Sequence, residues 1–232
     1  AILSGLVGSE MCIRDRSKES GIQTFRDSDG LWNNHRIEDV ASPEGFYRNP
    51  TLVYDFYNNR RKELNSGTEA NKGHYDLTEL EKTFKINIIT QNIDDLHERA
   101  GSKNVLHLHG EITKGRSTFS SSKLYDLVGT EINLGDLCDD GSQMRPHIVW
   151  FGEPVPMMEK AIDIVQESDY LIIIGTSLIV YPASGLIDYA RANVKKFYID
   201  PDAKSNLNRN DIELISMRAS EGVKSLVKRL ME

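Results

Sequence analysis

The chain has 232 residues, of which 39% are hydrophobic, and its 28 basic and 35 acidic side chains give a net charge of −7. This length and composition predict a soluble globular protein of one large domain or one and a half, with a sizeable core. No run of about 18 apolar residues is present, and no basic stem leads into an apolar segment of the kind that forms a secretory signal. We therefore expect a cytoplasmic protein with no membrane partner. A sequence pI near 5.5 also argues against nucleic-acid binding, which requires a basic surface.

Short β-branched runs alternate with segments of helical period from about residue 85 onward, which is typical of β-α-β units and a parallel sheet. Strands are predicted at 85–91, 105–109, 147–151, 170–175 and 196–200. Helices are predicted at 49–65, 76–84, 156–168, 181–192 and 221–232. The apolar run at 170–175 has no alternation, which indicates a strand buried on both faces. The predicted fold class is α/β, with a Rossmann-like doubly wound parallel sheet.

Three segments do not fit this alternation of strands and helices. Residues 27–48 are polar and aromatic, and residues 112–145 are rich in Ser, Gly, Asp and Thr, so both are interpreted as insertions that form lids or a small subdomain. In residues 1–16, small polar residues interrupt the apolar ones, and Arg14-Asp15-Arg16 is expected to break any strand.

A turn of small polar residues, Gly175-Thr176-Ser177, follows the strand predicted to be buried. Ligands bind beyond the carboxyl ends of strands in open α/β sheets, and such a turn lets backbone N–H groups approach a phosphate or ribose. An ordinary strand-to-helix turn is the alternative. Asp200 ends the next predicted strand, where an acidic residue can meet a nucleotide ribose, so the two features together favour a nucleotide site.

A second polar turn, Thr90-Gln91-Asn92-Ile93-Asp94, ends the strand predicted at 85–91. Its amides and carboxylate are suited to binding a carboxamide and ribose hydroxyls. Helix capping by Asn92 or Asp94 is the alternative interpretation.

Two histidines occupy the run Leu106-His107-Leu108-His109-Gly110. Strand alternation puts Val105, His107 and His109 on one face. A histidine at a strand end can meet a substrate hydroxyl and, with an ordinary pKa near about 6.5, can act as a general base. A satisfied structural histidine is the alternative for His109.

Taken in order, these segments resemble the sirtuin family of NAD-dependent protein deacylases. The resemblance covers residues 17–232 and is carried by the runs 19–26, 29–32, 90–94, 106–110, 145–153 and 175–177. It implies a Rossmann-like domain plus a small insertion module, with NAD and acyl-lysine meeting in the cleft between them. Residues 17–232 are thus interpreted as the catalytic domain, with insertions at about 27–75 and 112–145 forming the small module.

The resemblance also implies a role for each motif residue. His109 would be the general base that activates a ribose hydroxyl after the acyl oxygen has displaced nicotinamide, and Asn92 would hold the reacting ribose. The other implied NAD contacts are Ser17, Phe25, Arg26, Gln91, Ile93, Asp94, Gly175, Thr176, Ser177, Asp200 and Ala219. An extended substrate would lie along Val149, Trp150, Phe151, Gly152 and Glu153, held mostly through the backbone. The products would be nicotinamide, free lysine and an O-acyl-ADP-ribose.

Substrate choice is suggested by Tyr57 and Arg60, which are three residues apart and share a helix face. An arginine fork pairs with a carboxylate, which is the chemistry needed to select a malonyl or succinyl group over acetyl. The Tyr-x-x-Arg spacing resembles the class III sirtuins, which remove acidic acyl groups. Without the family, Tyr57 could equally be a core residue and Arg60 a solvated charge.

The zinc cysteines of most family members are missing here. The positions of the first Cys-x-x-Cys pair read Ser117-Thr118-Phe119-Ser120, the second region offers only Cys138, and Cys12 is the one other cysteine. One thiolate cannot build a tetrahedral site, so we expect no zinc. The module would instead be held by hydrogen bonds and by packing of Phe119, Leu124, Tyr125 and Leu127.

The phosphate-binding loop also departs from the family, in which a first strand runs into Gly-Ala-Gly-x-Ser. The positions before Ser17 read Ile13, Arg14, Asp15 and Arg16, which cannot take the conformations of glycine or its close approach to a pyrophosphate. We expect residues 1–16 to be foreign, such as translated adapter or a misjoined read. A real replacement would remove the first strand together with the loop and weaken NAD binding.

The leading hypothesis is an NAD-dependent lysine desuccinylase and demalonylase with weaker deacetylase activity, acting on acyl-lysine proteins or peptides. A general deacetylase or an ADP-ribosyl transferase is the alternative among enzymes. An inactive acyl-lysine or nucleotide-binding module is the alternative outside enzymes, because the glycine loop is missing. A dehydrogenase is disfavoured, since no Gly-x-Gly-x-x-Gly run opens a helix.

Overall fold

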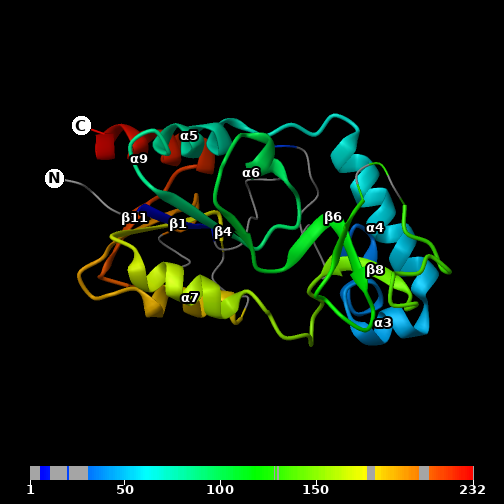
Figure 1. Cartoon of the computed structure of the whole chain (residues 1–232). Helices are drawn as coiled ribbons and strands as arrows, with labels where there is room; N and C mark the ends of the chain where they lie inside the picture. Colours follow the sequence, from blue (N-terminus) through cyan, green and yellow to red (C-terminus); the bar gives the residue numbers. More distant parts are fainter. Residues whose placement is uncertain are drawn as a thin grey trace.

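The structure is a computed structural model that describes residues 6–10, 20, 31–127, 129, 131–176, 181–203 and 209–231. The described chain forms two bodies (Figure 1). The larger body holds a six-stranded sheet, and the smaller one holds helix α4 and a three-stranded sheet.

All neighbouring strands of the larger sheet run parallel, in the order β11-β10-β9-β1-β4-β5. The strands are β1 (Leu6–Glu10), β4 (Ile86–Thr90), β5 (Val105–His107), β9 (Tyr170–Ile174), β10 (Lys195–Ile199) and β11 (Ile212–Ile215). This is the parallel α/β arrangement that the sequence predicts.

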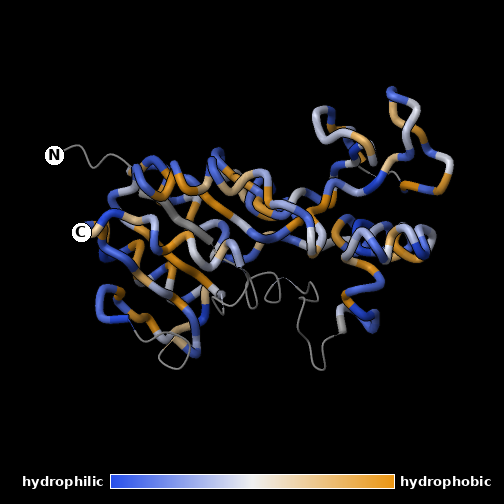
Figure 2. Tube along the Cα trace, turned by 90° about the horizontal axis from the view of Figure 1, so that it is seen from below, coloured by the Kyte–Doolittle hydropathy of each residue, from blue (hydrophilic) through white to orange (hydrophobic). Residues whose placement is uncertain are grey.

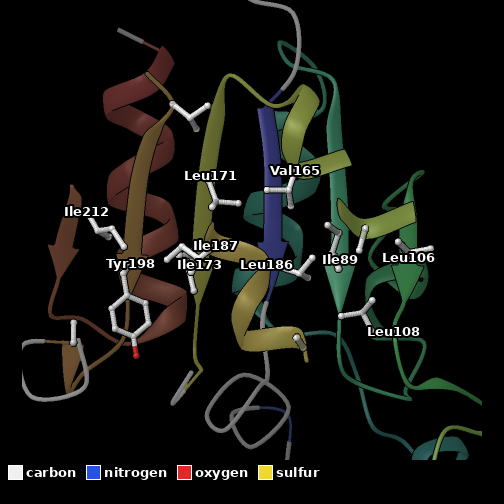
Figure 3. Close-up of a cluster of buried hydrophobic side chains, with 14 residues drawn as sticks. Ile89, Leu106, Leu108, Val165, Leu171, Ile173, Leu186, Ile187, Tyr198 and Ile212 are labelled. Carbon is white, nitrogen blue, oxygen red and sulfur yellow. The ribbon is translucent and has the colours of Figure 1, made fainter. Parts of the chain in front are cut away.

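Helices cover both faces of this sheet. In β9, Leu171 and Ile173 pack against α7 (Met158–Glu167) and the 3-10 helix η1 (Ala183–Tyr189), as Figure 3 shows for the η1 side chains. The alternate residues Ile172 and Ile174 pack with residues of α5 (Lys72–Leu80) and α9 (Ala219–Met231). The strand is therefore buried on both sides, as its unbroken apolar run predicts, and hydrophobic stretches run through the interior of the larger body (Figure 2).

The smaller body packs short helices against an antiparallel sheet. The helices are α2 (Ile37–Val40), α3 (Pro43–Arg48) and α4 (Pro50–Asn65), next to the hairpin of β2 (Leu31–Trp32) and β3 (His35–Arg36). The sheet has the order β7-β6-β8, with β6 (Gly110–Ser117), β7 (Leu124–Asp126) and β8 (Met144–Ile148). Ser42 and Asn49 cap α3 and α4 with a proline following each, which explains where these helices begin.

One hydrophobic core joins the two halves of the smaller body. It includes Val53, Phe56 and Tyr57 from α4 and Ile112 and Ile148 from the sheet. The expected packing residues behave differently from one another: Leu127 is buried, but Phe119 and Leu124 are 90% and 41% exposed. The prediction that Phe119 and Leu124 pack the module is therefore wrong, because both lie at the outer end of the β6–β7 hairpin.

Three sequence predictions about the elements require correction. The strand predicted at 147–151 overlaps β8 only at 147–148, and residues 149–151 lie in the loop that follows. β8 pairs antiparallel with β6 in the small sheet, because β propensity does not specify a partner strand. The helix predicted at 181–192 is the shorter 3-10 helix η1. The expectation that a replaced N-terminal segment would lack the first strand is also wrong, since residues 6–10 are the strand β1 between β9 and β4.

None of the helices in the described part of the chain is long and apolar enough to cross a membrane.

Candidate active site

The polar turns predicted from sequence follow β4, β9 and β10, which are parallel strands of one sheet. Their carboxyl ends therefore meet at one edge of the sheet, where ligands bind in open α/β folds. His109 follows β5 and leads directly into β6 of the smaller body. The site thus lies where the chain passes from the larger body to the smaller one.

The turn after β4 is held by its own side chains. The Asn92 N–H donates to Thr90 Oγ1 (3.1 Å), and the Asn92 side-chain amide donates to Asp94 Oδ2 (3.1 Å). Asp94 Oδ1 also accepts from the Leu96 N–H (3.3 Å), at the start of helix α6 (Leu96–Arg99). Asp94 therefore supports the helix start, as the capping alternative predicts, and this contact fixes its carboxylate at the sheet edge.

His109 contacts the same turn. Its Nδ1 lies 3.1 Å from the carbonyl oxygen of Gln91. A carbonyl oxygen only accepts, so Nδ1 carries the proton and Nε2 keeps the lone pair that a base needs. Burial lowers the pKa of His109, with the Gln91 carbonyl opposing part of that shift. His109 is thus a neutral imidazole at neutral pH, in the tautomer required for proton abstraction.

The position after His109 requires a glycine, Gly110. Its φ is +83°, and a Cβ at this position would lie 2.0 Å from the carbonyl oxygen of His147. Any side chain would force apart β6 and β8, which pair at Gly110 and Ile148.

Replacing Gly110 by alanine is expected to lower the free energy of unfolding by at least about 2 kcal/mol, through strain and overpacking. Urea unfolding checks this. Gly67→Ala is the matched control, because Gly67 has φ +109° with no atom within 4 Å of an added Cβ. Equal losses for both variants would show that the contact with His147 does not limit this position.

The turn after β9 lies beside the end of β10. Gly175 has φ +59°, and its N–H donates to the Ile199 carbonyl (2.9 Å). Thr176 is buried, and its carbonyl accepts from the Tyr198 hydroxyl. Asp200 is also buried, and its Oδ1 accepts from the Asp202 N–H (2.8 Å). The structure therefore brings Gly175, Thr176 and Asp200 to one edge, as predicted.

One atom of the β4 turn could accept a hydrogen bond from a ribose hydroxyl of NAD. Gln91 is 6% exposed, and its Oε1 has no hydrogen-bond partner among the described residues. A buried amide oxygen without a donor costs about 1–3 kcal/mol, and a ribose hydroxyl would supply that donor. The turn at Gly175 likewise has no atom within 4 Å of an added Cβ, so it leaves room for close approach.

The remaining predicted NAD contacts are placed as follows. Ile93 is half-buried against the core of the smaller body, and its carbonyl accepts from the Ile112 N–H (2.7 Å). Ala219 begins α9 and is buried in the core between α9 and the sheet. Four predicted contacts and the loop positions 13–16 lie outside the described residues; the four are Ser17, Phe25, Arg26 and Ser177.

Tyr57 and Arg60 point into one aromatic cluster in the smaller body. Tyr57 is fully buried, and its hydroxyl accepts from Trp150 Nε1 (3.1 Å). The Arg60 guanidinium lies 4.7 Å from the centre of the Trp32 ring and is 8% exposed. Burial lowers the pKa of Arg60, and among the charges that oppose this shift is Asp94 of the β4 turn. Tyr57 and Arg60 are therefore both buried among the aromatic residues of the smaller body.

The edge predicted to clasp the substrate is a rigid loop. Arg145 donates to both carboxylate oxygens of Glu153 (2.6 and 3.1 Å), and its guanidinium lies 3.4 Å from the centre of the Trp150 ring. Glu153 Oε2 also accepts from the Trp150 N–H (2.8 Å). Desolvation opposes ionisation of Glu153, but Arg145 and the Trp150 N–H outweigh it and lower its pKa. The Glu153 side chain thus stabilises the conformation of the loop through its bonds to Arg145 and to the Trp150 N–H.

The backbone of the loop 149–153 is hydrogen-bonded to His109. The Val149 N–H donates to the His109 carbonyl (2.9 Å), and the Phe151 N–H donates to the Ala41 carbonyl (3.0 Å). Phe151 and Gly152 are exposed, and Gly152 has φ +89°. A peptide strand along this edge would therefore draw mainly on carbonyl groups, within reach of His109.

Sequence reasoning missed two features of the site. Arg145 was not singled out, although its place eight residues before Glu153 allows the pair that holds the loop. His107 also contacts both Glu98 and the carbonyl of Asn92 in the β4 turn. The alternation that puts His107 on the same face as His109 was the available signal for His107, whereas nothing local indicates Glu98.

The fold and the site together define a Rossmann-like protein with polar turns at one edge of its sheet, a neutral histidine that contacts one of these turns, and a buried arginine among the aromatic rings of the smaller body. In comparisons with known proteins, residues 16–182 match the family described as the Sir2 family. A protein of Helicobacter pylori (strain ATCC 700392 / 26695) named NAD-dependent protein deacylase is 50% identical over 216 residues, which cover 93% of each chain.

Solved structures agree with this match. A Sir2 homologue in complex with NAD superimposes with a TM-score of 0.82 at 36% identity, covering 97% of this chain and 89% of that chain. Sir2Tm bound to a propionylated peptide gives a TM-score of 0.72 at 27% identity, covering 97% of this chain and 93% of that one. The chain belongs to the Sir2 family, and the predictions of a sirtuin enzyme, of a Rossmann-like α/β fold and of NAD dependence are confirmed.

Proposed function

We propose that this NAD-dependent protein deacylase removes succinyl and malonyl groups from protein lysines and acts more weakly on acetyl-lysine. The observation that carries the proposal is the position of Arg60, which is buried over the Trp32 ring one turn after the buried Tyr57 on α4. The planar guanidinium of arginine can pair with a carboxylate through two parallel N–H bonds, so it is suited to the terminal carboxylate of an acidic acyl group.

The two consecutive arginines of α4 have different surroundings. Arg61 donates Nε to the Ile112 carbonyl (2.9 Å) and Nη1 to Asn58 Oδ1 (2.8 Å), so it is used to join α4 to β6. Arg60 instead lies among aromatic rings, with Tyr57 one turn before it on α4. Aromatic walls would accept the methylene groups of a succinyl chain, while the guanidinium would bind its terminal carboxylate.

In the reaction, bound NAD would supply the ADP-ribosyl group that accepts the acyl group, with nicotinamide as the leaving group. Asn92 and Asp94 would orient the ribose through their side chains, and Gln91 Oε1 would accept from a hydroxyl. His109 Nε2 would take the proton of the ribose hydroxyl that attacks the acyl carbon, while Nδ1–H stays on the Gln91 carbonyl. The loop 149–153 would hold the lysine-bearing strand against this centre.

The direct test incubates the full chain with NAD and equal amounts of a succinyl-lysine and an acetyl-lysine peptide, with nicotinamide and both products followed by mass spectrometry. The proposal expects succinyl removal to dominate. Preferential acetyl removal would overturn the acyl preference and favour a general deacetylase.

The test requires one companion protein, because Ile13 to Arg16 replace the glycines of the phosphate loop. In the companion these four residues are changed to Gly-Ala-Gly-Ile. Turnover by the companion alone would locate the defect in residues 13–16. Peptide binding without nicotinamide release by either protein would instead support a binding module.

We also propose that the small module folds without zinc. Ser117, at the first cysteine position, accepts through Oγ from the N–H groups of Phe119 (2.9 Å) and Ser120 (3.0 Å) and contacts the Ser142 hydroxyl. These bonds hold the ends of the hairpins where a metal would otherwise sit. Burial raises the pKa of the Cys138 thiol, which disfavours the thiolate that zinc needs. Within the described ranges, no group of three or more metal-binding side chains exists.

A chelator is accordingly expected to leave the melting temperature unchanged, whereas Ser117→Ala should lower it by several degrees, since about 1–3 kcal/mol of hydrogen bonding is lost. Differential scanning fluorimetry with elemental analysis measures both. Ser122→Ala is the control, because that exposed hydroxyl contacts only Ser120 among described residues. Stoichiometric zinc, or melting that falls with chelator, would contradict the proposal.

A further inference from the structure

His107, two residues before the proposed base, has no part in the reaction described above. It ends strand β5, and its side chain is 7% exposed. Its Nδ1 lies 2.9 Å from the carbonyl oxygen of Asn92, and its Nε2 lies 2.9 Å from Glu98 Oε1 on helix α6. The ring thus bridges the β4 turn and a carboxylate.

The two partners determine the protonation state of this ring. A carbonyl and a carboxylate only accept hydrogen bonds, so both ring nitrogens carry protons and His107 is an imidazolium. Burial alone would lower the pKa of His107, but the hydrogen bond and charge of Glu98, with the Asn92 carbonyl, raise it overall. His107 in turn lowers the pKa of Glu98 against the opposing desolvation.

The other titratable groups around this pair come from three elements. Glu111 of β6 adds to the upward shift of the His107 pKa, and His97 of α6 adds to the downward shift for Glu98. His147 of β8 has its pKa lowered to about 4 by burial and by nearby Arg116 and Arg145, so it is neutral at neutral pH. None of these groups opposes the charged pair under ordinary conditions.

We propose that Glu98 and His107 form a positioning pair that holds the Asn92 carbonyl and thereby aims the Asn92 side chain at the reacting ribose. Three groups of Asn92 are hydrogen-bonded: its N–H to Thr90, its side-chain amide to Asp94 and its carbonyl to His107. Loss of the third contact frees the peptide plane after Asn92. The inference rests on the proposed role of Asn92.

The pair has a pH dependence of known sign. Above the raised pKa, His107 has one proton for two acceptors, so one contact is lost as pH rises through that value. The remaining proton stays on Nε2 towards the charged Glu98, the stronger acceptor, so the contact with Asn92 is the one lost. Positioning is therefore present above the lowered pKa of Glu98 and is lost as pH rises through the raised pKa of His107. His109 acts in the opposite direction, because its lowered pKa must be exceeded before it can serve as a base.

A double-mutant cycle on the full chain, or on the loop-repaired companion if only that protein turns over, tests the inference. Glu98→Ala is expected to lower kcat/KM for NAD about tenfold, and Asn92→Ala more. In the Asn92→Ala background, Glu98→Ala should cost less than twofold, because the pair acts through Asn92. Full additivity would overturn the positioning role. Unchanged turnover in Asn92→Ala alone would instead overturn the proposed function of this turn.

Glu98→Gln separates charge from geometry. The glutamine amide can donate to Nε2 while Nδ1–H stays on Asn92, so most activity should return and the alkaline limb of the pH profile should disappear. A structural role alone would leave that limb in place. Arg99→Ala is the control on the same helix. It loses the ion pair with Asp95 (2.8 Å) and the hydrogen bonds to Leu64, Asn65 and Thr68. None of these contacts involves His107, so the pH profile should stay unchanged.

A second measurement requires no turnover. Imidazole resonances followed by NMR should show His107 titrating above about 6.5 and His109 below it. Glu98→Ala should shift only the His107 titration downward. A His107 that titrates at or below the ordinary value in the unmodified protein would overturn the pair.

Discussion

Replacing Arg60 by methionine is expected to lower kcat/KM for a succinyl-lysine peptide by about 100-fold and to leave acetyl-lysine turnover within about twofold. The loss corresponds to a charge-assisted hydrogen-bonded contact of roughly 3 kcal/mol, made in a site where the guanidinium is 8% exposed. Methionine keeps the length and apolar stem of the side chain against Trp32 and Phe56, so the pocket retains its shape. Steady-state kinetics with both peptides measures the ratio.

Arg60→Lys is the companion variant, because lysine keeps the charge without the planar fork. An intermediate loss is expected for succinyl removal. Arg61 would be an unsuitable control, since its bonds to Ile112 and Asn58 hold α4 on β6. If succinyl turnover survives Arg60→Met, the pocket has been assigned to the wrong residue.

Replacing His109 by alanine is expected to lower kcat by about 10²–10⁴-fold, the usual contribution of a positioned general base. The KM for the peptide should change little, because the Val149 contact to residue 109 comes from its backbone carbonyl and survives the substitution. Single-turnover measurements of nicotinamide release and lysine formation would separate the two stages. A variant that deacylates at the parent rate would exclude His109 as the base.

The same residue sets the acid limb of the pH profile. Only neutral His109 can accept a proton, and burial lowers its pKa, so activity should fall as pH drops through a value below about 6.5. Profiles of kcat/KM in buffers of constant ionic strength measure this limb. An acid midpoint above the ordinary histidine value would contradict the buried, Gln91-bound geometry.

The strands of the larger sheet were predictable where local pattern and burial agree. The unbroken apolar run at 170–174 has both faces covered by helices, so its composition alone is enough to predict that the strand is buried on both faces. The strand at 144–148 pairs with β6, which follows His109 and Gly110 in the chain. No local pattern in the sequence of this strand indicates that partner. Residues 212–215 were missed because four residues are too short for a periodic signal.

The site was predictable to the extent that its residues follow strands directly. The residues Gln91, Asn92, Asp94, His109, Gly175 and Asp200 all follow strands of the larger sheet, so a parallel fold alone brings them to one edge. Arg60 and Trp32 meet only because α4 packs against the β2–β3 hairpin, and Glu98 reaches His107 across a turn of the chain. Such contacts depend on tertiary packing, which single-sequence periodicity does not contain.

The central place of β1 has a consequence for biosynthesis. Leu6 pairs with Ile86 on one side and with Tyr170 on the other, so its partners lie 86 − 6 = 80 and 170 − 6 = 164 residues later. Until β1 inserts, the β4–β5 and β9–β10–β11 halves share no sheet hydrogen bonds. β1 can therefore complete its pairing only after residues up to 172 have been made, and the large sequence separation of its partners favours slow formation of this pairing.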